Sequence, residues 1–138
     1  MATKKIILCD TNIFIELFHE NDRMTQELDY LGFDRLAISV VAAAEIYYGM
    51  RKRETARTKD LIRKFNLYHL DKDISNLFIQ FMQGYRDKGI SVPDALVAAT
   101  AVSHNVALFT LNRSDFDFIK GQKLYNPRFL GLANTPSA

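Results

Sequence analysis

Lys4-Lys5-Ile6-Ile7-Leu8-Cys9-Asp10 is a short apolar run that opens with two lysines and ends at a carboxylate. Its length and its Ile and Leu content are typical of a buried β-strand. Three more carboxylates, Glu45, Asp94 and Asp115, stand beside later apolar segments. In an open α/β sheet the carboxyl ends of the strands border one crevice, where ligands bind. We therefore predict that the four acids gather at that edge of a parallel sheet.

Strand-like and helical patterns alternate along the whole chain. Strands are predicted at residues 4–10, 36–39, 66–70 and 106–110, with a last candidate at 123–125. Helices are predicted at 12–18, 23–31, 41–50, 54–65, 72–88, 93–104 and 114–119. Such alternation implies a parallel sheet that is covered on both faces. The predicted fold class is α/β, a three-layer α/β/α sandwich around a mainly parallel sheet of about five strands.

Length and composition narrow the class of protein. The 138 residues fit one domain, residues 1–138, and 48% hydrophobic residues are enough for its core. The small, polar segment 133–138 is expected to fray. A single cysteine excludes an internal disulfide and a cysteine-based zinc cage. No apolar run is long enough to cross a bilayer, and the amino terminus leaves no room for a secretory signal, so we expect a cytoplasmic protein.

Each acid taken alone has an ordinary structural explanation. Asp10 and Asp115 could cap helices, Asp94 could favour the first turn of one, and Glu45 could be an exposed helix position. Their shared position at strand ends favours a common site. Four carboxylates in one crevice could not all stay ionised without a cation, and Mg²⁺ or Mn²⁺ suits their oxygens. Thr11 and Asn12 could bond the freed backbone amides beside Asp10 or orient its carboxylate.

The order of four motifs adds a family resemblance. They are Asp10-Thr11-Asn12, Ala44-Glu45-Ile46-Tyr47-Tyr48-Gly49, Pro93-Asp94-Ala95-Leu96-Val97-Ala98-Ala99-Thr100-Ala101, and Thr110-Leu111-Asn112-Arg113-Ser114-Asp115-Phe116. In this order and spacing, over residues 6–129, the chain resembles a PIN domain, and within that group the VapC-type toxins of toxin–antitoxin pairs. The resemblance implies that Asp10, Glu45, Asp94 and Asp115 surround one or two Mg²⁺ or Mn²⁺ ions. It also implies that Thr11 and Asn112 support the metal site.

What the resemblance implies about activity and partners is specific. It implies an endoribonuclease that cuts tRNA or rRNA and leaves a 5′-phosphate and a 3′-hydroxyl. A small VapB-like antitoxin would neutralise it by covering the crevice, and the chain would form a homodimer. We expect Asp10, Asp94 and Asp115 to be the inner metal ligands. Glu45 could bind the metal directly, bind it through water, or act as the base.

A basic segment offers a route for RNA. Residues 51–64 hold seven basic and two acidic residues, a net charge of +5, although the whole chain carries only +2. Such a patch beside an acidic metal site could hold a phosphate backbone, and a solvated helix face explains it equally well. The candidate RNA contacts are Arg51, Lys52, Arg53 and Arg57.

Two other functions remain open from the sequence. A phosphatase or phosphotransfer domain would use Asp10 as its nucleophile. The haloacid-dehalogenase-like pattern wants a second aspartate two residues later, where this chain has Asn12. A non-catalytic module of the same fold would only grip nucleic acid. The complete set of four acids argues against that, and divalent-dependent cleavage would decide it.

Overall fold

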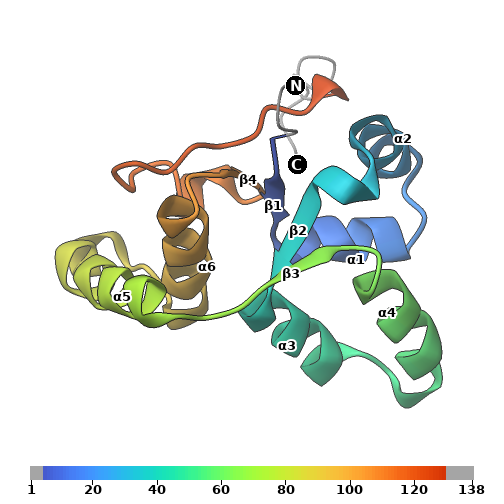
Figure 1. Cartoon of the computed structure of the whole chain (residues 1–138), viewed down its shortest axis with the longest axis horizontal. Coiled ribbons are helices and arrows are strands. Elements are labelled where there is room, and N and C mark those ends of the chain that lie inside the picture. Colours follow the sequence, from blue (N-terminus) through green and yellow to red (C-terminus); the bar gives the residue numbers. More distant parts are fainter. Residues whose placement is uncertain (1–4, 130–138) are drawn as a thin grey trace.

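The centre of the fold is a four-stranded parallel sheet, seen in a computed structural model that describes residues 5–129. Its strands are β1 (Ile7–Cys9), β2 (Leu36–Ser39), β3 (Asn66–Tyr68) and β4 (Ala107–Phe109). They lie in the order β3-β2-β1-β4 (Figure 1). Leu8 pairs with Ala37 on one side and with Leu108 on the other. The first strand is therefore central, which explains why the opening apolar run is buried on both faces.

Helices cover both faces of this sheet (Figure 1). The six α-helices are α1 (Thr11–Phe18), α2 (Asp22–Leu31), α3 (Val40–Gly49), α4 (Thr55–Ile62), α5 (Lys72–Gly84) and α6 (Val92–Ser103). Side chains alternate across a strand, so Ile7 and Cys9 belong to the core beneath α1 to α4. Leu8 belongs to the second core, beneath α5 and α6. The three predicted layers are confirmed.

Four short 3-10 helices complete the secondary structure of the described chain. They are η1 (Phe33–Arg35), η2 (Lys52–Glu54), η3 (Arg86–Lys88) and η4 (Arg113–Asp115). The long helix predicted at 72–88 is in fact α5 followed by η3. Gly84 ends the α-helix, and the hydroxyl of Tyr85 accepts a hydrogen bond from the amide of Lys120 at 2.8 Å. Gly89 then closes η3 at a φ of +71°.

Two further predicted elements were wrong. Residues 114–119 form no α-helix: the turn η4 is followed by irregular chain, although Phe116 and Ile119 are both buried. So short a segment would close few α-helical hydrogen bonds. Residues 123–125 form no strand beyond a single parallel bridge between Leu108 and Leu124. The sheet therefore has four strands rather than five. The segment 133–138, expected to fray, lies outside the described residues.

None of the helices within residues 5–129 is both long enough and apolar enough to cross a bilayer.

Candidate active site

Asp10 stands at the junction of β1 and α1 and serves as the N-cap of that helix. Its Oδ1 accepts a hydrogen bond from the backbone amide of Thr11 at 2.8 Å, and its Oδ2 accepts one from the hydroxyl of Thr110 at 2.8 Å. The side chain is 7% exposed. A carboxylate oxygen can accept about two hydrogen bonds, so both oxygens keep acceptor capacity after these contacts. Asp10 can therefore cap α1 and still bind a metal ion, so its capping role does not exclude a role in the site.

Thr110 is the residue that sequence reasoning missed. It lies directly after β4, is 3% exposed, and donates its hydroxyl to Asp10. The same oxygen accepts the amide of Asn112 at 3.1 Å and the side-chain amide of Asn12 at 3.4 Å. One donation and two acceptances use the whole capacity of a hydroxyl. No local sequence signal marks this role, because it depends on β4 lying beside β1.

The other three acids come from three different elements. Glu45 lies on the exposed side of α3 and accepts the hydroxyl of Thr11 at 3.3 Å. Asp94 is half-buried in the first turn of α6, where Ser91 is the N-cap and accepts the Asp94 amide at 3.1 Å. Asp115 is exposed and ends η4. Ser91 therefore takes the capping role that could have explained Asp94, which leaves the Asp94 carboxylate available.

Electrostatics shows that the four acids share one region. Burial raises the pKa of Asp94, a hydrogen bond with Ser91 opposes the rise, and the charges of Asp10, Asp115 and Glu45 add to it. Burial likewise raises the pKa of Asp10, and the charge of Asp115 contributes, while the bonds from Thr110 and Thr11 act against the shift. The neighbourhood therefore disfavours a full set of negative charges.

The predicted supporting residues take distinct roles. Thr11 links Asp10 to Glu45, through its amide and its hydroxyl respectively. Asn12 bridges to the far side of the site, because its Oδ1 accepts the amide of Leu111 at 3.2 Å and its Nδ2 donates to Thr110. Asn112 contributes its backbone amide. Together these bonds join the end of β4 to the first turn of α1.

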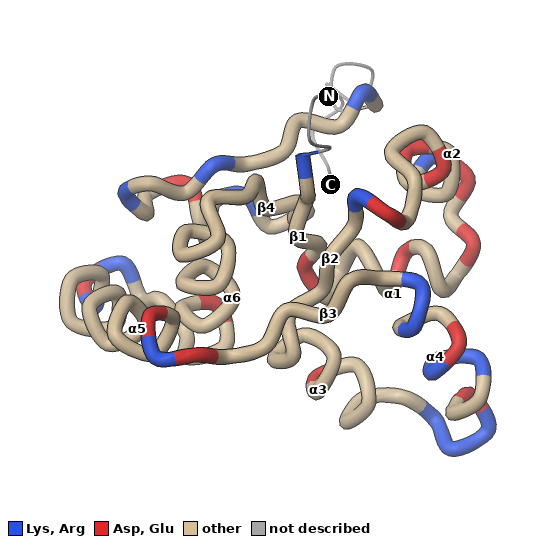
Figure 2. Tube along the Cα trace, in the orientation of Figure 1, with Lys and Arg blue, Asp and Glu red and all other residues tan. Residues whose placement is uncertain are grey.

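A groove beside Glu45 reaches Arg51, the first residue of the basic segment. It has a volume of about 380 Å³ and is lined by α1, α3 and the start of α4, with Thr11 and Glu45 among its walls. Arg51 lines the same groove. Figure 2 shows the basic residues gathered around η2 and α4. Arg57 points elsewhere: its guanidinium donates to the backbone carbonyl of Phe18. The Cζ of Arg57 lies 4.0 Å from the centre of the Phe18 ring, and its Nη2 lies 3.7 Å from Oε1 of Glu20.

The donor set suits a hard divalent cation by its chemistry. Carboxylate oxygens are the ligands that Mg²⁺ and Mn²⁺ prefer, and a cation would offset the mutual repulsion of the acids. The ligands are not gathered into a finished cage: within residues 5–129, no three acidic, histidine or cysteine side chains converge closely enough to hold an ion as they stand. Glu45 and Asp115 are both exposed, so their side chains have room to close on an ion.

Comparisons with known proteins agree with this arrangement. A family model described as the PIN domain matches residues 7–121. Ribonuclease VapC1 from Methanocaldococcus jannaschii is 27% identical over an aligned length of 125 residues, and the match covers 87% of this chain and 87% of that one. Among solved structures, a toxin–antitoxin complex from Klebsiella pneumoniae has 32% identity and a TM-score of 0.73, covering 84% of this chain and 94% of that one. DNA-bound VapBC from Salmonella typhimurium, at 21% identity and a TM-score of 0.78, shares the fold over 88% of this chain and 97% of that one.

Proposed function

Because the chain belongs to the PIN domain family, we propose that it is a divalent-metal-dependent endoribonuclease and the toxin of a VapBC-type pair. The relative named Ribonuclease VapC1 supports the ribonuclease activity. The observation that supports the proposal is that the four acids lie near enough for their charges to interact: burial and the charges of Asp10, Asp115 and Glu45 raise the pKa of Asp94, and burial and the charge of Asp115 raise the pKa of Asp10.

The cofactor in this proposal is Mg²⁺ or Mn²⁺, as one or two ions. Asp10, Asp94 and Asp115 would be the inner ligands. When bound, such an ion lowers the pKa of a bound water and supplies hydroxide near neutral pH. Asp10 keeps one orientation because Thr11 and Thr110 each hold one of its oxygens. Glu45 is exposed on α3. It would bind the ion directly, bind it through water, or accept a proton as the base.

The RNA would approach along the groove that lies beside Glu45 and reaches the basic segment. Arg51 lines this groove together with Glu45, and Lys52 and Arg53 follow it in η2. Phosphate contacts by such residues supply most of the sequence-independent affinity for nucleic acid. Arg57 would contribute less, because the Phe18 carbonyl, the Phe18 ring and Glu20 already engage it. The RNA in this proposal is a tRNA or an rRNA.

A VapB-like antitoxin is the proposed protein partner. Similar solved structures are toxin–antitoxin complexes, among them VapBC2 from Rickettsia felis bound to a promoter DNA fragment, at 24% identity and a TM-score of 0.77 over 88% of this chain. A peptide segment of the antitoxin would cover the crevice and place an arginine or lysine among the acids. The test is to add the purified cognate antitoxin to the cleavage reaction. Unchanged cleavage would refute this partner.

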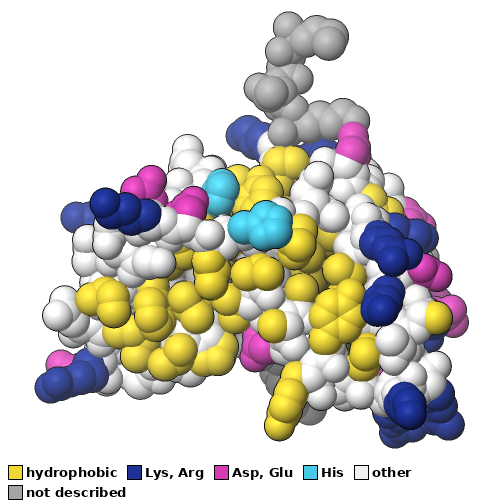
Figure 3. All heavy atoms as spheres, turned by 60° about the horizontal axis from the view of Figure 1, so that its bottom comes forward, with side chains coloured by type: hydrophobic (Ala, Val, Ile, Leu, Met, Phe, Trp, Pro, Cys, Tyr) yellow, Lys and Arg dark blue, Asp and Glu magenta, His cyan; other side chains and the backbone are white. Residues whose placement is uncertain are grey.

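The chain is also proposed to form a homodimer. Figure 3 shows hydrophobic side chains spread over one face of the molecule. Exposed large apolar side chains lie on α3, β3, α5 and α6, and Tyr48 is 95% exposed. Contiguous exposed apolar patches often mark sites of protein–protein contact. Sedimentation should find a dimer for the natural chain and a larger monomer fraction for Tyr48→Asp. A natural chain that sediments only as a monomer would refute the dimer.

The experiment for the activity compares two matched aspartate variants. Asp10→Asn removes a site acid, whereas Asp117→Asn neutralises an exposed aspartate two residues beyond Asp115. With Mg²⁺ or Mn²⁺, we expect discrete RNA fragments from the natural chain and from Asp117→Asn, and none from Asp10→Asn. Expression in cells should be toxic in the same pattern. Cleavage by folded Asp10→Asn would remove Asp10 from the mechanism. Absence of cleavage by the natural chain would favour a non-catalytic binding role.

A further inference from the structure

A buried carboxylate outside the four-acid cluster lies on α2. Glu27 is only 2% exposed and shares the buried face of its helix with Met24, Leu28 and Leu31. A charge in such a position is costly unless it is paired and fully hydrogen-bonded. The contacts of Glu27 therefore indicate what this charge holds in place.

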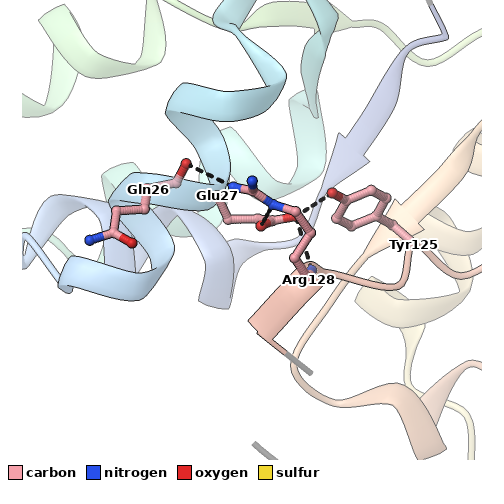
Figure 4. A network of polar contacts seen from close by, with 4 residues as sticks. All are labelled: Gln26, Glu27, Tyr125 and Arg128. Atoms are coloured by element: carbon pink, nitrogen blue, oxygen red, sulfur yellow. Dashed lines mark hydrogen bonds and ion pairs between the residues drawn. The ribbon is translucent and has the colours of Figure 1, made fainter. Parts of the chain in front are cut away.

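The hydrogen-bond donors to the Glu27 carboxylate, among the described residues, belong to the segment of chain that follows β4 (Figure 4). The hydroxyl of Tyr125 donates to its Oε2, the Nε of Arg128 donates to its Oε1 at 2.9 Å, and the backbone amide of Arg128 reaches Oε2 at 3.3 Å. Burial raises the pKa of Glu27, but these bonds outweigh it, so the pKa lies below its usual range. Glu27 is thus an ionised anchor for residues 125–128.

Arg113 also binds the segment of residues 125–128. The guanidinium of Arg113 donates from Nη1 to the carbonyl of Tyr125 at 2.9 Å and from Nη2 to Oδ1 of Asn126 at 2.9 Å. Arg113 is the first residue of η4, and Asp115 is the last. A continuous chain of contacts therefore runs from the buried anchor on α2, through residues 125–128, to the turn that carries the fourth acid.

The turn η4 needs such support. It is three residues long and no side chain caps it, and Asp115 is exposed. The chain around the turn is also held by the Asn112 amide on Thr110, the Leu111 amide on Asn12 and the buried ring of Phe116. Arg113 adds a restraint to the turn through its two bonds to Tyr125 and Asn126. The two bonds from Arg113 supply that restraint only while the segment they hold is itself fixed.

We propose that Glu27 is a positioning residue for the active site: by anchoring Tyr125 and Arg128, it fixes the segment that Arg113 grips and so sets the place of Asp115 beside Asp10 and Asp94. The inference rests on the proposed function, because it assigns Asp115 a part in holding the divalent ion. Removal of a group that orients a metal ligand without touching the metal commonly lowers metal affinity or activity by roughly 10- to 100-fold.

The first test measures Mn²⁺ binding by calorimetry without RNA. Glu27→Gln keeps the shape of the side chain and removes its charge, and Asp29→Asn neutralises an exposed acid on the same helix as the control. We expect Mn²⁺ to bind Glu27→Gln about 10-fold more weakly and Asp29→Asn as tightly as the natural chain. In cleavage assays kcat should fall while KM for RNA stays, since the basic groove is untouched.

Arg113→Lys covers the case in which Glu27→Gln does not fold. It keeps the positive charge but cannot bridge Tyr125 and Asn126 with a planar fork. It should weaken Mn²⁺ binding like Glu27→Gln. If the two act through one chain of contacts, the double variant should bind no more weakly than the weaker single variant. Fully additive losses, or unaltered binding in folded Arg113→Lys, would overturn the proposal.

A readout independent of metal and RNA separates this inference from the proposed function. In metal-free protein, the NMR amide signals of residues 113–116 should shift in Glu27→Gln and stay in place in Asp29→Asn. Unmoved signals would overturn the positioning role even if the natural chain cleaves RNA. Shifted signals in a chain that neither binds Mn²⁺ nor cleaves RNA would refute the proposed function and confine Glu27 to holding the turn.

Discussion

Replacing Thr110 by valine tests the hydroxyl at the centre of the site. Valine keeps the shape of threonine and removes the donor to Asp10 and the acceptor for the Asn112 amide. Thr100 provides a matched control, because it is equally buried and its hydroxyl bonds only to the carbonyl of Leu96, at 2.8 Å. Both changes exchange one buried hydroxyl for a methyl group, so the gain in apolar burial cancels in the comparison.

The expected magnitudes follow from the kinds of bond that are lost. A hydrogen bond to a charged group contributes about 1.5–3 kcal/mol, and a neutral bond contributes about 0.5–1.5 kcal/mol. Thr110→Val should therefore lower the free energy of unfolding by about 2–3 kcal/mol and Thr100→Val by about 1 kcal/mol. Because the hydroxyl also orients Asp10, cleavage by Thr110→Val should fall roughly 10- to 100-fold, and Thr100→Val should keep its activity.

The stability deficit should also depend on pH in a known direction. Burial raises the pKa of Asp10 and the Thr110 bond partly lowers it, so Thr110→Val should raise that pKa further. A carboxyl whose pKa is higher in the folded chain binds its proton more tightly there. Its contribution to stability then falls as the pH rises from the ordinary aspartate pKa through the raised one. The deficit of Thr110→Val should be small below that window and full above it.

Denaturant melts of both variants at acidic and neutral pH, beside RNA cleavage rates, would measure these effects. Equal stability losses in Thr110→Val and Thr100→Val would show that the Asp10 bond has no special weight. Unchanged cleavage by Thr110→Val would refute the claim that Thr110 orients Asp10.

Three other predictions concern the acids and the turn beside them. Asp94→Asn should raise the melting temperature of metal-free protein at neutral pH while abolishing cleavage, because it removes a charge that burial and three neighbouring acids disfavour; a lowered temperature would contradict this. Glu45→Gln should leave the melting temperature unchanged, since Glu45 is exposed, and should strongly reduce cleavage. Phe116→Ala should cost about 3–5 kcal/mol in denaturant unfolding, because that ring is fully buried; a loss below about 1 kcal/mol would show that Phe116 does not anchor the Asp115 turn.

Local patterns were sufficient to predict most of the fold. A strand such as β2 was predicted at its observed bounds because a short apolar run between polar turns is a strong local signal. The helix at 114–119 was wrong because so short a segment closes few α-helical hydrogen bonds, and Phe116 and Ile119 are buried at a spacing that a helix would also give. The predicted helix at 72–88 ran past Gly84, where α5 ends, and the next residue, Tyr85, bonds to Lys120, 35 residues away, a contact that no local pattern shows.

In the candidate site, too, some residues could be predicted from the sequence, and others are revealed only by contacts between distant residues. The prediction that the four acids gather rests on one topological rule, that parallel strands share an edge. The role of Thr110 depends on β1 pairing with β4, which joins residues 100 apart, so no local pattern showed it. Glu27 lies on an amphipathic helix where an acid is usually solvated, and only the packing of residues 125–128 reveals it as a buried anchor.

Mapping the ends of RNA fragments made by the purified chain, with Mg²⁺ and with EDTA, tests the central claim most directly. Metal-dependent hydrolysis at the four acids predicts fragments with 5′-phosphate and 3′-hydroxyl ends, formed only when the metal is present. Fragments with 2′,3′-cyclic phosphate ends, formed equally in EDTA, would contradict it, because attack by the ribose hydroxyl needs no metal-bound water.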